Sequence, residues 1–317
     1  METVCEINSD TYSFASSFDL EYGPLRGFMA KNYYKVAEHL FSVDADNELF
    51  ALMSNYEPFL INGSESEPVF SLSIETSARP SCIEETRQEE EGQIIVCGHT
   101  SLNQPTFEFF LKDVFTGMSV CSPDYKSAVL YLPQEKNNIL YKFAINNTLM
   151  VLYALATAKL GTALFHAAVV TYGERGYLFL GKSGTGKSTH ARLWLRYNDG
   201  SELMNDDNPV VRFYGEGASA VVYGSPWSGK TPCYKNQEAP VGGFVFLSQA
   251  PYNKIQRLRG VSAYAALLPS ISGKRWDKAI ADGLHCTENA LASHVPVWHL
   301  ECLPDEAAAK LCCETIA

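Results

Sequence analysis

Short apolar or alternating stretches, separated by polar turns, fill the first 133 residues of the chain. This pattern is typical of β-strands, because side chains point alternately to the two faces of a strand. We expect strands at residues 11–18, 69–74, 93–97, 107–111 and 128–132. Over residues 33–43 the apolar residues recur at helical spacing instead, which predicts a helix. Residues 1–133 should therefore form a β-rich N-terminal domain, and no recognisable chemistry accompanies it.

An acidic run interrupts this pattern. Five of the eight residues from 84 to 91 are glutamates, and the run lies between two expected strands. Charge runs of this kind are usually solvated. We therefore predict an exposed loop at residues 84–91 rather than a metal site.

The second part of the chain, residues 134–317, has longer apolar segments of both periodicities. Residues 138–160 predict a buried helix that ends at Gly161. Further elements are expected in this order: a hairpin at 210–213 and 218–223, strands at 241–248 and 255–258, helices at 262–268 and 274–292, a strand at 295–300 and a helix at 305–316. Strands mixed with helices predict an α/β domain over residues 134–317.

Two apolar runs introduce the most informative part of the chain. Residues 164–170 are typical of a continuous buried strand, interrupted only by His166. Residues 173–176 form a turn that leads into the apolar run 177–180. The two runs should therefore pair as a hairpin.

The segment Gly181-Lys182-Ser183-Gly184-Thr185-Gly186-Lys187-Ser188 follows the second run and opens a helix over residues 189–197. This is the P-loop pattern in its strand–loop–helix setting, in which glycines let consecutive backbone N–H groups point at a phosphate. The alternative is a glycine turn between a strand and a helix. The predicted nucleotide contacts are Gly181, Ser183, Gly184, Thr185, Gly186, Lys187, Ser188 and Thr189. Lys187 should reach the phosphates, and Ser188 should bind Mg²⁺.

An aspartate pair, Asp206-Asp207, follows the predicted loop by about twenty residues. One carboxylate could hold a divalent cation, and the other could accept a proton from an attacking hydroxyl or orient it. A helix cap or a turn would also explain such a pair.

Three further features are candidates for the same site. His166 could be a metal ligand or a proton-transfer partner, or a satisfied core histidine. His190 is expected on the exposed surface of the predicted helix. The loop from Gly224 to Lys230, with Ser228 and Gly229, could be a second anion-binding loop that positions the acceptor, or a surface turn with a tryptophan packed beneath it.

Composition narrows the class of protein. The chain has 317 residues, 46% of them hydrophobic and 19% charged, which is ordinary for a folded protein. A formal net charge of -11 argues against a general nucleic-acid binder. Nine cysteines without a C-x-x-C pair favour reduced thiols and a cytoplasmic protein. The most apolar stretch, 148–158, is too short for a membrane span.

The order of His166-Ala167-Ala168, the loop Gly181–Ser188 and Asp206-Asp207 resembles the core of the HPr kinase/phosphorylase and phosphoenolpyruvate carboxykinase superfamily. The resemblance covers roughly residues 160–215 and leaves residues 1–133 unexplained. It implies a mixed-sheet P-loop kinase core. It also implies that His166 lies near metal and phosphates, that Lys187 and Ser188 contact nucleotide and metal, and that Asp206 and Asp207 supply a metal ligand and a catalytic base.

These observations predict a kinase that uses ATP with Mg²⁺, or with Mn²⁺, to phosphorylate a hydroxyl of a protein, a peptide or a small molecule. Asp206, Asp207, Lys187 and His166 are the predicted catalytic residues, and Ser188, Asp206 and His166 the predicted metal ligands. The alternative is a non-catalytic ATP-binding sensor whose N-terminal half binds a partner. A GTPase is disfavoured because the chain has no Asn-Lys-x-Asp motif. Assembly into a homo-oligomer stays open.

Overall fold

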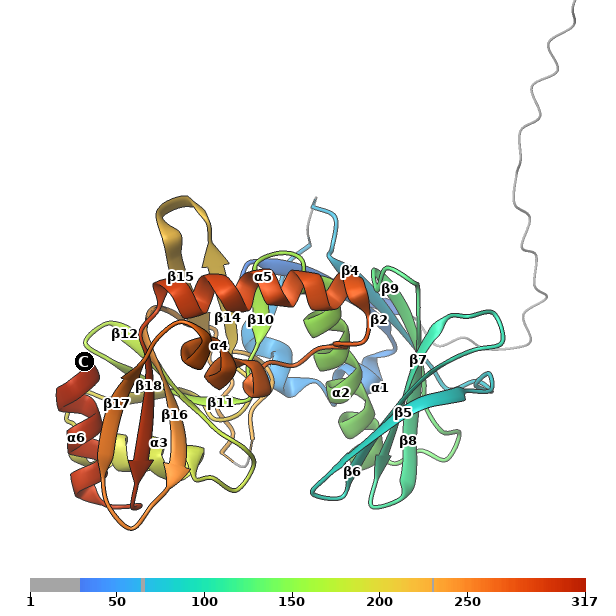
Figure 1. The fold of residues 1–317 in the computed structure, drawn as a ribbon. Helices are drawn as coiled ribbons and strands as arrows, with labels where there is room; N and C mark the ends of the chain where they lie inside the picture. The colour runs from blue at the N-terminus through green and yellow to red at the C-terminus, as the bar shows by residue number, and fades with distance from the viewer. Residues whose placement is uncertain (1–28, 64–65, 230) are drawn as a thin grey trace, which may run out of the picture.

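The computed structural model describes residues 29–63, 66–229 and 231–317. The strand expected at residues 11–18 lies outside the described residues. Two nine-stranded mixed sheets, with helices on and between them, form a mixed α/β fold with a β-rich N-terminal region (Figure 1). The predicted boundary near residue 133 falls between the last strand of the first sheet and the helix that follows it.

The first sheet is built from residues 30–131. Its spatial order is β3-β1-β2-β4-β9-β8-β7-β6-β5, with parallel pairing of β2 with β4 and of β4 with β9. The strands are β1 (Ala30–Val36), β2 (His39–Ala45), β3 (Leu60–Ile61), β4 (Phe70–Glu75), β5 (Ile83–Glu90), β6 (Gln93–His99), β7 (Pro105–Leu111), β8 (Val114–Cys121) and β9 (Ser127–Tyr131); the short helices α1 (Asn47–Phe50) and η1 (Ser54–Phe59) lie between β2 and β3. The strands expected at 69–74, 93–97, 107–111 and 128–132 are confirmed.

The helix predicted at residues 33–43 is wrong. This segment is the β1–β2 hairpin, which turns at Ala37 and Glu38 with φ values of 45° and 64°. The turn lacks the glycine or asparagine that usually marks a two-residue hairpin, so the chance recurrence of apolar residues at helical spacing was misleading.

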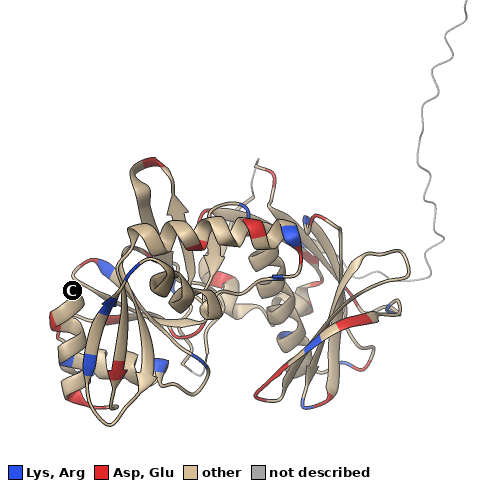
Figure 2. Cartoon of the chain, in the orientation of Figure 1, with Lys and Arg blue, Asp and Glu red and all other residues tan. Residues whose placement is uncertain are grey.

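The loop predicted at residues 84–91 is also wrong, because most of this run is strand β5 at the edge of the first sheet. Its side chains are nearly all exposed, as expected for a solvated run. Figure 2 shows the acidic residues along this strand. Charged side chains are common on edge strands, because they discourage pairing with strands of other chains. The acidic composition of this run is therefore compatible with a strand.

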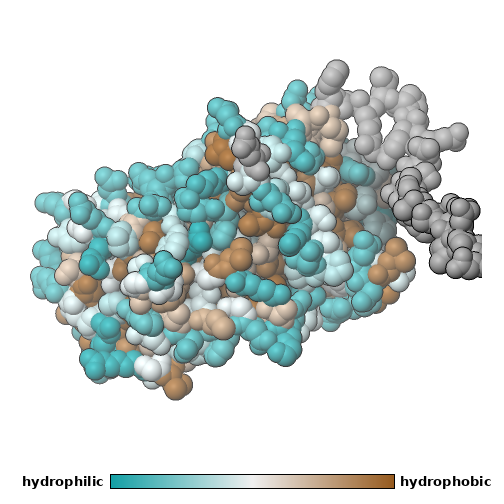
Figure 3. All heavy atoms as spheres, turned by 90° about the horizontal axis from the view of Figure 1, so that it is seen from above, coloured by the Kyte–Doolittle hydropathy of each residue, from teal (hydrophilic) through white to brown (hydrophobic). Residues whose placement is uncertain are grey.

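Helix α2 (Asn138–Thr157) confirms the predicted buried helix and lies between the two sheets. Its N-terminus is capped by Asn137, and Gly161, with φ 64°, follows its end. It contacts β4, β7 and β8 of the first sheet and β10 of the second. Among the described residues it is the one helix long and apolar enough in composition to cross a membrane, but 56% of its apolar stretch is buried inside the fold. Its burial between the two sheets is that of a core helix. Figure 3 shows apolar residues scattered among hydrophilic ones on one face of the molecule.

The second sheet carries the candidate site. Its main order is β10-β14-β15-β16-β12-β11-β13, with β18 beside β16 and β17 beside β18. The strands are β10 (Thr162–Leu164), β11 (Ala167–Tyr172), β12 (Arg175–Leu180), β13 (Glu202–Asn205), β14 (Val210–Tyr214), β15 (Ser219–Tyr223), β16 (Glu238–Gln249), β17 (Lys254–Leu258) and β18 (Val297–Cys302). The hairpins β11–β12 and β14–β15 confirm the predicted ones.

The continuous strand expected at residues 164–170 is divided in two. β10 pairs with β14, whereas β11 pairs with β12 and β13, and Phe165 and His166 lie between them. The chain therefore leaves one neighbour and joins another at His166. An apolar run does not reveal such a switch, because both halves are buried.

Helices cover both faces of the second sheet. Helices α3 (Lys187–Tyr197) and α6 (Glu306–Ile316) pack together over one face, around the fully buried Trp194. Helices α4 (Val261–Leu267), with η3 (Leu268–Ser270) after it, and α5 (Lys278–His294) pack over the other. These helices confirm the α/β prediction for the second part of the chain.

Candidate functional site

A glycine loop, residues 181–186, joins β12 to α3. Its glycines Gly181, Gly184 and Gly186 have φ values of 149°, 78° and 109°, which side-chain-bearing residues rarely adopt. Gly186 is also the N-cap of α3, and no side chain caps this helix end. The uncapped backbone N–H groups and the positive end of the helix dipole make the loop suitable for an anion.

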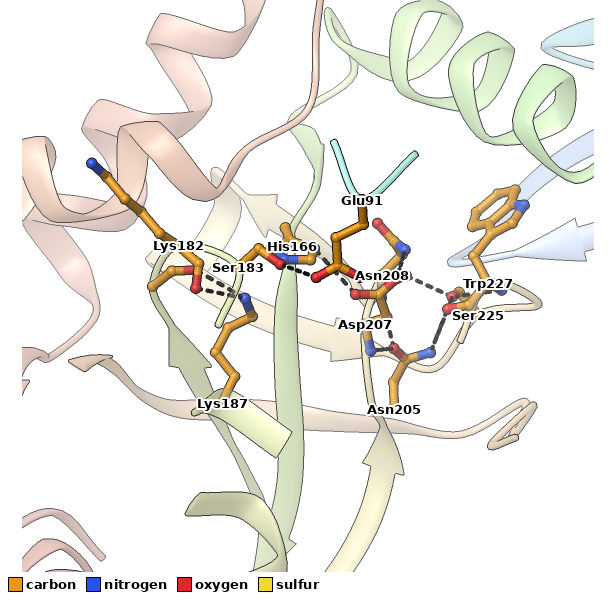
Figure 4. Close-up of polar contacts among 11 residues, drawn as sticks. Glu91, His166, Lys182, Ser183, Lys187, Asn205, Asp207, Asn208, Ser225 and Trp227 are labelled. Atoms are coloured by element: carbon orange, nitrogen blue, oxygen red, sulfur yellow. Dashed lines mark hydrogen bonds and ion pairs between the residues drawn. The ribbon is translucent and has the colours of Figure 1, made fainter. Parts of the chain in front are cut away.

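Lys187, the first residue of α3, lies beneath the loop and is only 8% exposed. Its Nζ donates to the carbonyl of Gly181 at 2.9 Å and to that of Lys182 at 3.4 Å (Figure 4). Burial lowers the pKa of Lys187, while carboxylates, Asp207 foremost, act in the opposite direction. A buried ammonium held by two neutral carbonyls can exchange them for a stronger acceptor such as a phosphate oxygen.

Ser188 and Thr189 occupy the first turn of α3 and are half-buried. Ser183 and Gly184, in the loop, are exposed, and Thr185 is half-buried. The backbone N–H of Thr185 donates to the carbonyl of Lys182. Ser183, Gly184, Thr185, Ser188 and Thr189 are thus reachable from solvent, whereas Gly181 and Lys187 are buried.

The histidine and one aspartate of the predicted set meet directly. His166 Nδ1 lies 3.1 Å from Asp207 Oδ1 (Figure 4). A carboxylate accepts, so Nδ1 carries the hydrogen, and Nε2 has no hydrogen-bond partner although the atom itself is buried. The backbone adds a second link, because Ala167 N donates to the Asp207 carbonyl. The break between β10 and β11 therefore places His166 against the aspartate pair.

Asn205 organises the turn that carries the aspartates. It is fully buried, and its Oδ1 accepts from the backbone N–H groups of Asp207 and Asn208, both at 2.9 Å. Its Nδ2 donates to Ser225 Oγ and to the carbonyl of Trp227, both at 3.1 Å. A backbone N–H only donates and a carbonyl only accepts, so these contacts fix the orientation of the amide.

The other acidic residue, Asp206, is 5% exposed and is one of the carboxylates that act on Lys187. Asp207 also accepts from Asn208 Nδ2 at 2.7 Å. Among the described residues no group of three or more His, Cys, Asp or Glu side chains is arranged to hold a metal ion. The hard oxygen donors of Ser188 and the aspartates nevertheless suit Mg²⁺, which keeps several waters and binds one or two protein carboxylates together with phosphates.

The loop that begins at Gly224 has the tryptophan packed beneath it that one of the two expectations required. Trp227 is 4% exposed and packs beneath it, donating from Nε1 to Tyr56 Oη at 2.9 Å. A Cβ added at Gly229 would lie 3.2 Å from Asp207 Cβ, so this end of the loop lies against the aspartate. Ser228 Oγ donates to the carbonyl of Thr231.

The start of the predicted loop packs against a different segment of the chain. Gly224 packs against the backbone of Lys235, where a Cβ would approach its carbonyl oxygen to 2.0 Å. Lys230 lies outside the described residues. The loop is thus anchored at its start and meets the candidate site at Gly229.

The surface position expected for His190 is wrong. His190 is 3% exposed, its ring packs against Phe179, and its Nε2 accepts from Trp194 Nε1 at 3.2 Å. Burial lowers its pKa to about 4. It belongs to the core beneath α3, because this face of the helix packs on the sheet.

Two residues that organise the site carry no local signal in the sequence. The role of Asn205 depends on its burial and on a distant loop that carries Ser225 and Trp227, which no local pattern reveals. Glu91, at the tip of the β5–β6 hairpin of the first sheet, accepts from Ser183 Oγ at 2.8 Å. Its contact with a loop of the second sheet depends on how the two sheets pack, which no local pattern reveals.

Two cavities, of about 540 and 380 Å³, are lined mainly by residues of α2, α5 and their neighbours. Neither includes a residue of this site. The glycine loop at residues 181–186 lines neither cavity, so cavity volume does not identify the candidate site.

No protein-family model matches this chain, and no curated protein matches it. Among solved structures, the HPr(Ser) kinase/phosphatase from Coxiella burnetii is similar with 14% sequence identity and a TM-score of 0.27. The match covers 48% of this chain and 92% of that chain.

Proposed function

We propose that this protein is an ATP- and Mg²⁺-dependent phosphotransferase of HPr-kinase-like type, with a P-loop at residues 181–188. It would move the γ-phosphoryl group of ATP to a hydroxyl of a protein, a peptide or a small molecule. The observation that carries the proposal is the pairing of His166 with Asp207 close to the buried Lys187. Phosphoryl transfer needs a cation such as Lys187 to bind the polyphosphate and a carboxylate such as Asp207 to orient the acceptor hydroxyl, and the two must lie close together.

Each residue has a distinct task in this proposal. The N–H groups of the loop and the Lys187 ammonium bind phosphate oxygens and stabilise their charge. Asp207 orients the acceptor hydroxyl and accepts its proton, while His166 Nδ1 holds the carboxylate in place. Mg²⁺, when bound, would neutralise charge on the phosphates, and Ser188 and Asp206 would hold it. Mn²⁺ could serve in the same role.

A non-catalytic ATP sensor is the second candidate, and one contact favours it. Ser183 of the glycine loop bonds to Glu91 of the first sheet, so occupancy of the loop could be communicated to the N-terminal half. A sensor does not need Asp207 as a base, whereas a kinase does.

Two measurements separate these functions. Calorimetry with ATP and Mg²⁺ tests binding, and an ATP-consumption assay with and without cell extract tests transfer to an acceptor. The kinase proposal predicts binding together with consumption that needs extract and disappears in Asp207→Asn. Tight binding without consumption under either condition supports the sensor, and absence of binding contradicts both.

A further inference from the structure

The β5–β6 hairpin reaches from the first sheet to the glycine loop. Its two-residue turn is Glu91-Gly92, with φ values of 49° and 78°, and Glu90 pairs with Gln93 at its base. Glutamate is not a favoured residue at a positive φ. The turn nevertheless places the Glu91 carboxylate beside Ser183, within the cluster that contains Asp207 and His166 (Figure 4).

A second contact holds the same hairpin against the second part of the chain. Lys274 Nζ lies 3.7 Å from Glu85 Oε2 on β5, and the lysine side chain is only 12% exposed. Lys274 precedes α5, whereas Ser183 precedes α3, so β5 is attached at both ends to different segments. The hairpin is therefore held against the second part of the chain at two points rather than projecting freely from the sheet.

The electrostatic consequence concerns the anion site. The charges of Glu90 and Glu91 act on the Lys187 ammonium, together with those of the two aspartates. A polyphosphate bound to the same loop would bring several further negative charges near these glutamates. Like charges that share a small region repel, and the repulsion is strongest where water is partly excluded.

We propose that the β5–β6 hairpin tip is an autoinhibitory contact, in which Glu91 binds the glycine loop through Ser183 and must move away when ATP binds. The N-terminal sheet thus regulates access to the nucleotide site. This inference rests on the proposed function, because it takes the ligand of the loop to be a polyphosphate.

Calorimetry with ATP tests the contact in the full chain. Glu91→Gln removes the charge at the tip, and Glu89→Gln is the matched control, because Glu89 lies on the same hairpin but is not among the four carboxylates that act most on Lys187. We expect Glu91→Gln to lower the Kd for ATP by about three- to tenfold and Glu89→Gln to leave it unchanged. An equal or higher Kd in Glu91→Gln overturns this inference alone. If wild type, Glu91→Gln and Glu89→Gln all fail to bind ATP, both the autoinhibitory contact and the proposed kinase function are contradicted.

A cross-linking experiment tests the movement directly. The double variant Ser183→Cys/Glu91→Cys should form a disulfide under mild oxidation, identified by mass spectrometry of the linked peptides, and ATP should slow its formation. The pair Ser183→Cys/Glu89→Cys should cross-link much less. Equal cross-linking of the two pairs, or a rate that ATP leaves unchanged, would contradict a contact that opens for the nucleotide.

Discussion

His166 Nδ1 lies 3.1 Å from Asp207 Oδ1, and this pair joins the break between β10 and β11 to the turn after β13. The aspartate also accepts from Asn208 Nδ2, so both of its oxygens are held. A carboxylate fixed in this way is suited to orient an acceptor hydroxyl. The histidine is then a positioning residue, acting through Asp207.

Substitution of His166 tests this role. We expect His166→Ala to lower kcat by about ten- to a hundredfold and to leave the Kd for ATP nearly unchanged. His166→Asn keeps a donor near the position of Nδ1 and should recover much of the rate. Steady-state kinetics and calorimetry measure the two effects. Equal losses in both variants would contradict positioning and favour metal binding through Nε2.

Lys187 should be required for nucleotide binding and not for folding. Lys187→Met removes a buried ammonium but keeps the apolar stem, so we expect the Kd for ATP to rise about a hundredfold. The free energy of unfolding should change by no more than about 1 kcal/mol, because the variant no longer buries a charge. Lys182→Met is the control, because Lys182 lies in the same loop but is exposed. Similar binding by Lys187→Met and wild type would rule out the assigned role.

Asn205 should matter most for stability. Asn205→Ala breaks four hydrogen bonds and leaves buried backbone groups unpaired, at a cost of about 2 to 4 kcal/mol in the free energy of unfolding. Asn236→Ala is the control, because Asn236 makes one exposed contact with the carbonyl of Pro58. Urea denaturation measures both. A loss within about 0.5 kcal/mol for Asn205→Ala would show that the amide does not hold the turn.

Much of the second part of the chain could be predicted from sequence. Glycines at positive φ and a strand followed by a helix are local features, so the loop at 181–186 was found from its residues. The contact of His166 with Asp207 is not local. The apolar run around His166 does not show where the chain changes its neighbours, and the family resemblance placed the histidine near metal and phosphates without predicting this contact.

The first sheet was harder to predict for a related reason. The β1–β2 hairpin turns at Ala37 and Glu38, which carry no sequence signal for a turn. β5 consists mostly of charged and polar residues, so it lacks the alternation of apolar and polar positions that predicts a strand. Strand pairing depends on partners far along the chain, whereas helices and glycine loops depend on adjacent residues.

Two buried histidines should make the fold sensitive to acid. Burial lowers the pKa of His190 and of His39 to about 4 each. In the unfolded chain they would titrate near 6.5, so between pH 6.5 and pH 4 the unfolded state binds more protons than the folded state. The free energy of unfolding should therefore fall as pH falls through this window, by about 1.4 kcal/mol per pH unit for each histidine.

His190→Gln isolates one of these contributions. Glutamine can still accept from Trp194 but does not titrate, so the slope between pH 6.5 and pH 4 should decrease by about 1.4 kcal/mol per pH unit. The exposed His294 provides the control variant His294→Gln. Urea denaturation at several pH values gives the slopes. Identical slopes for His190→Gln and wild type would show that His190 is not kept neutral by burial.

Transfer of labelled phosphate tests the central claim most directly. Wild-type protein and Asp207→Asn are incubated with γ-labelled ATP, Mg²⁺ and a mixture of metabolites and cell proteins, and labelled products are separated. The kinase proposal predicts one class of hydroxyl-bearing acceptor labelled by the wild type and not by Asp207→Asn, with ATP binding retained in both. Equal labelling by the two proteins, or no transfer by a wild type that binds ATP, would contradict it.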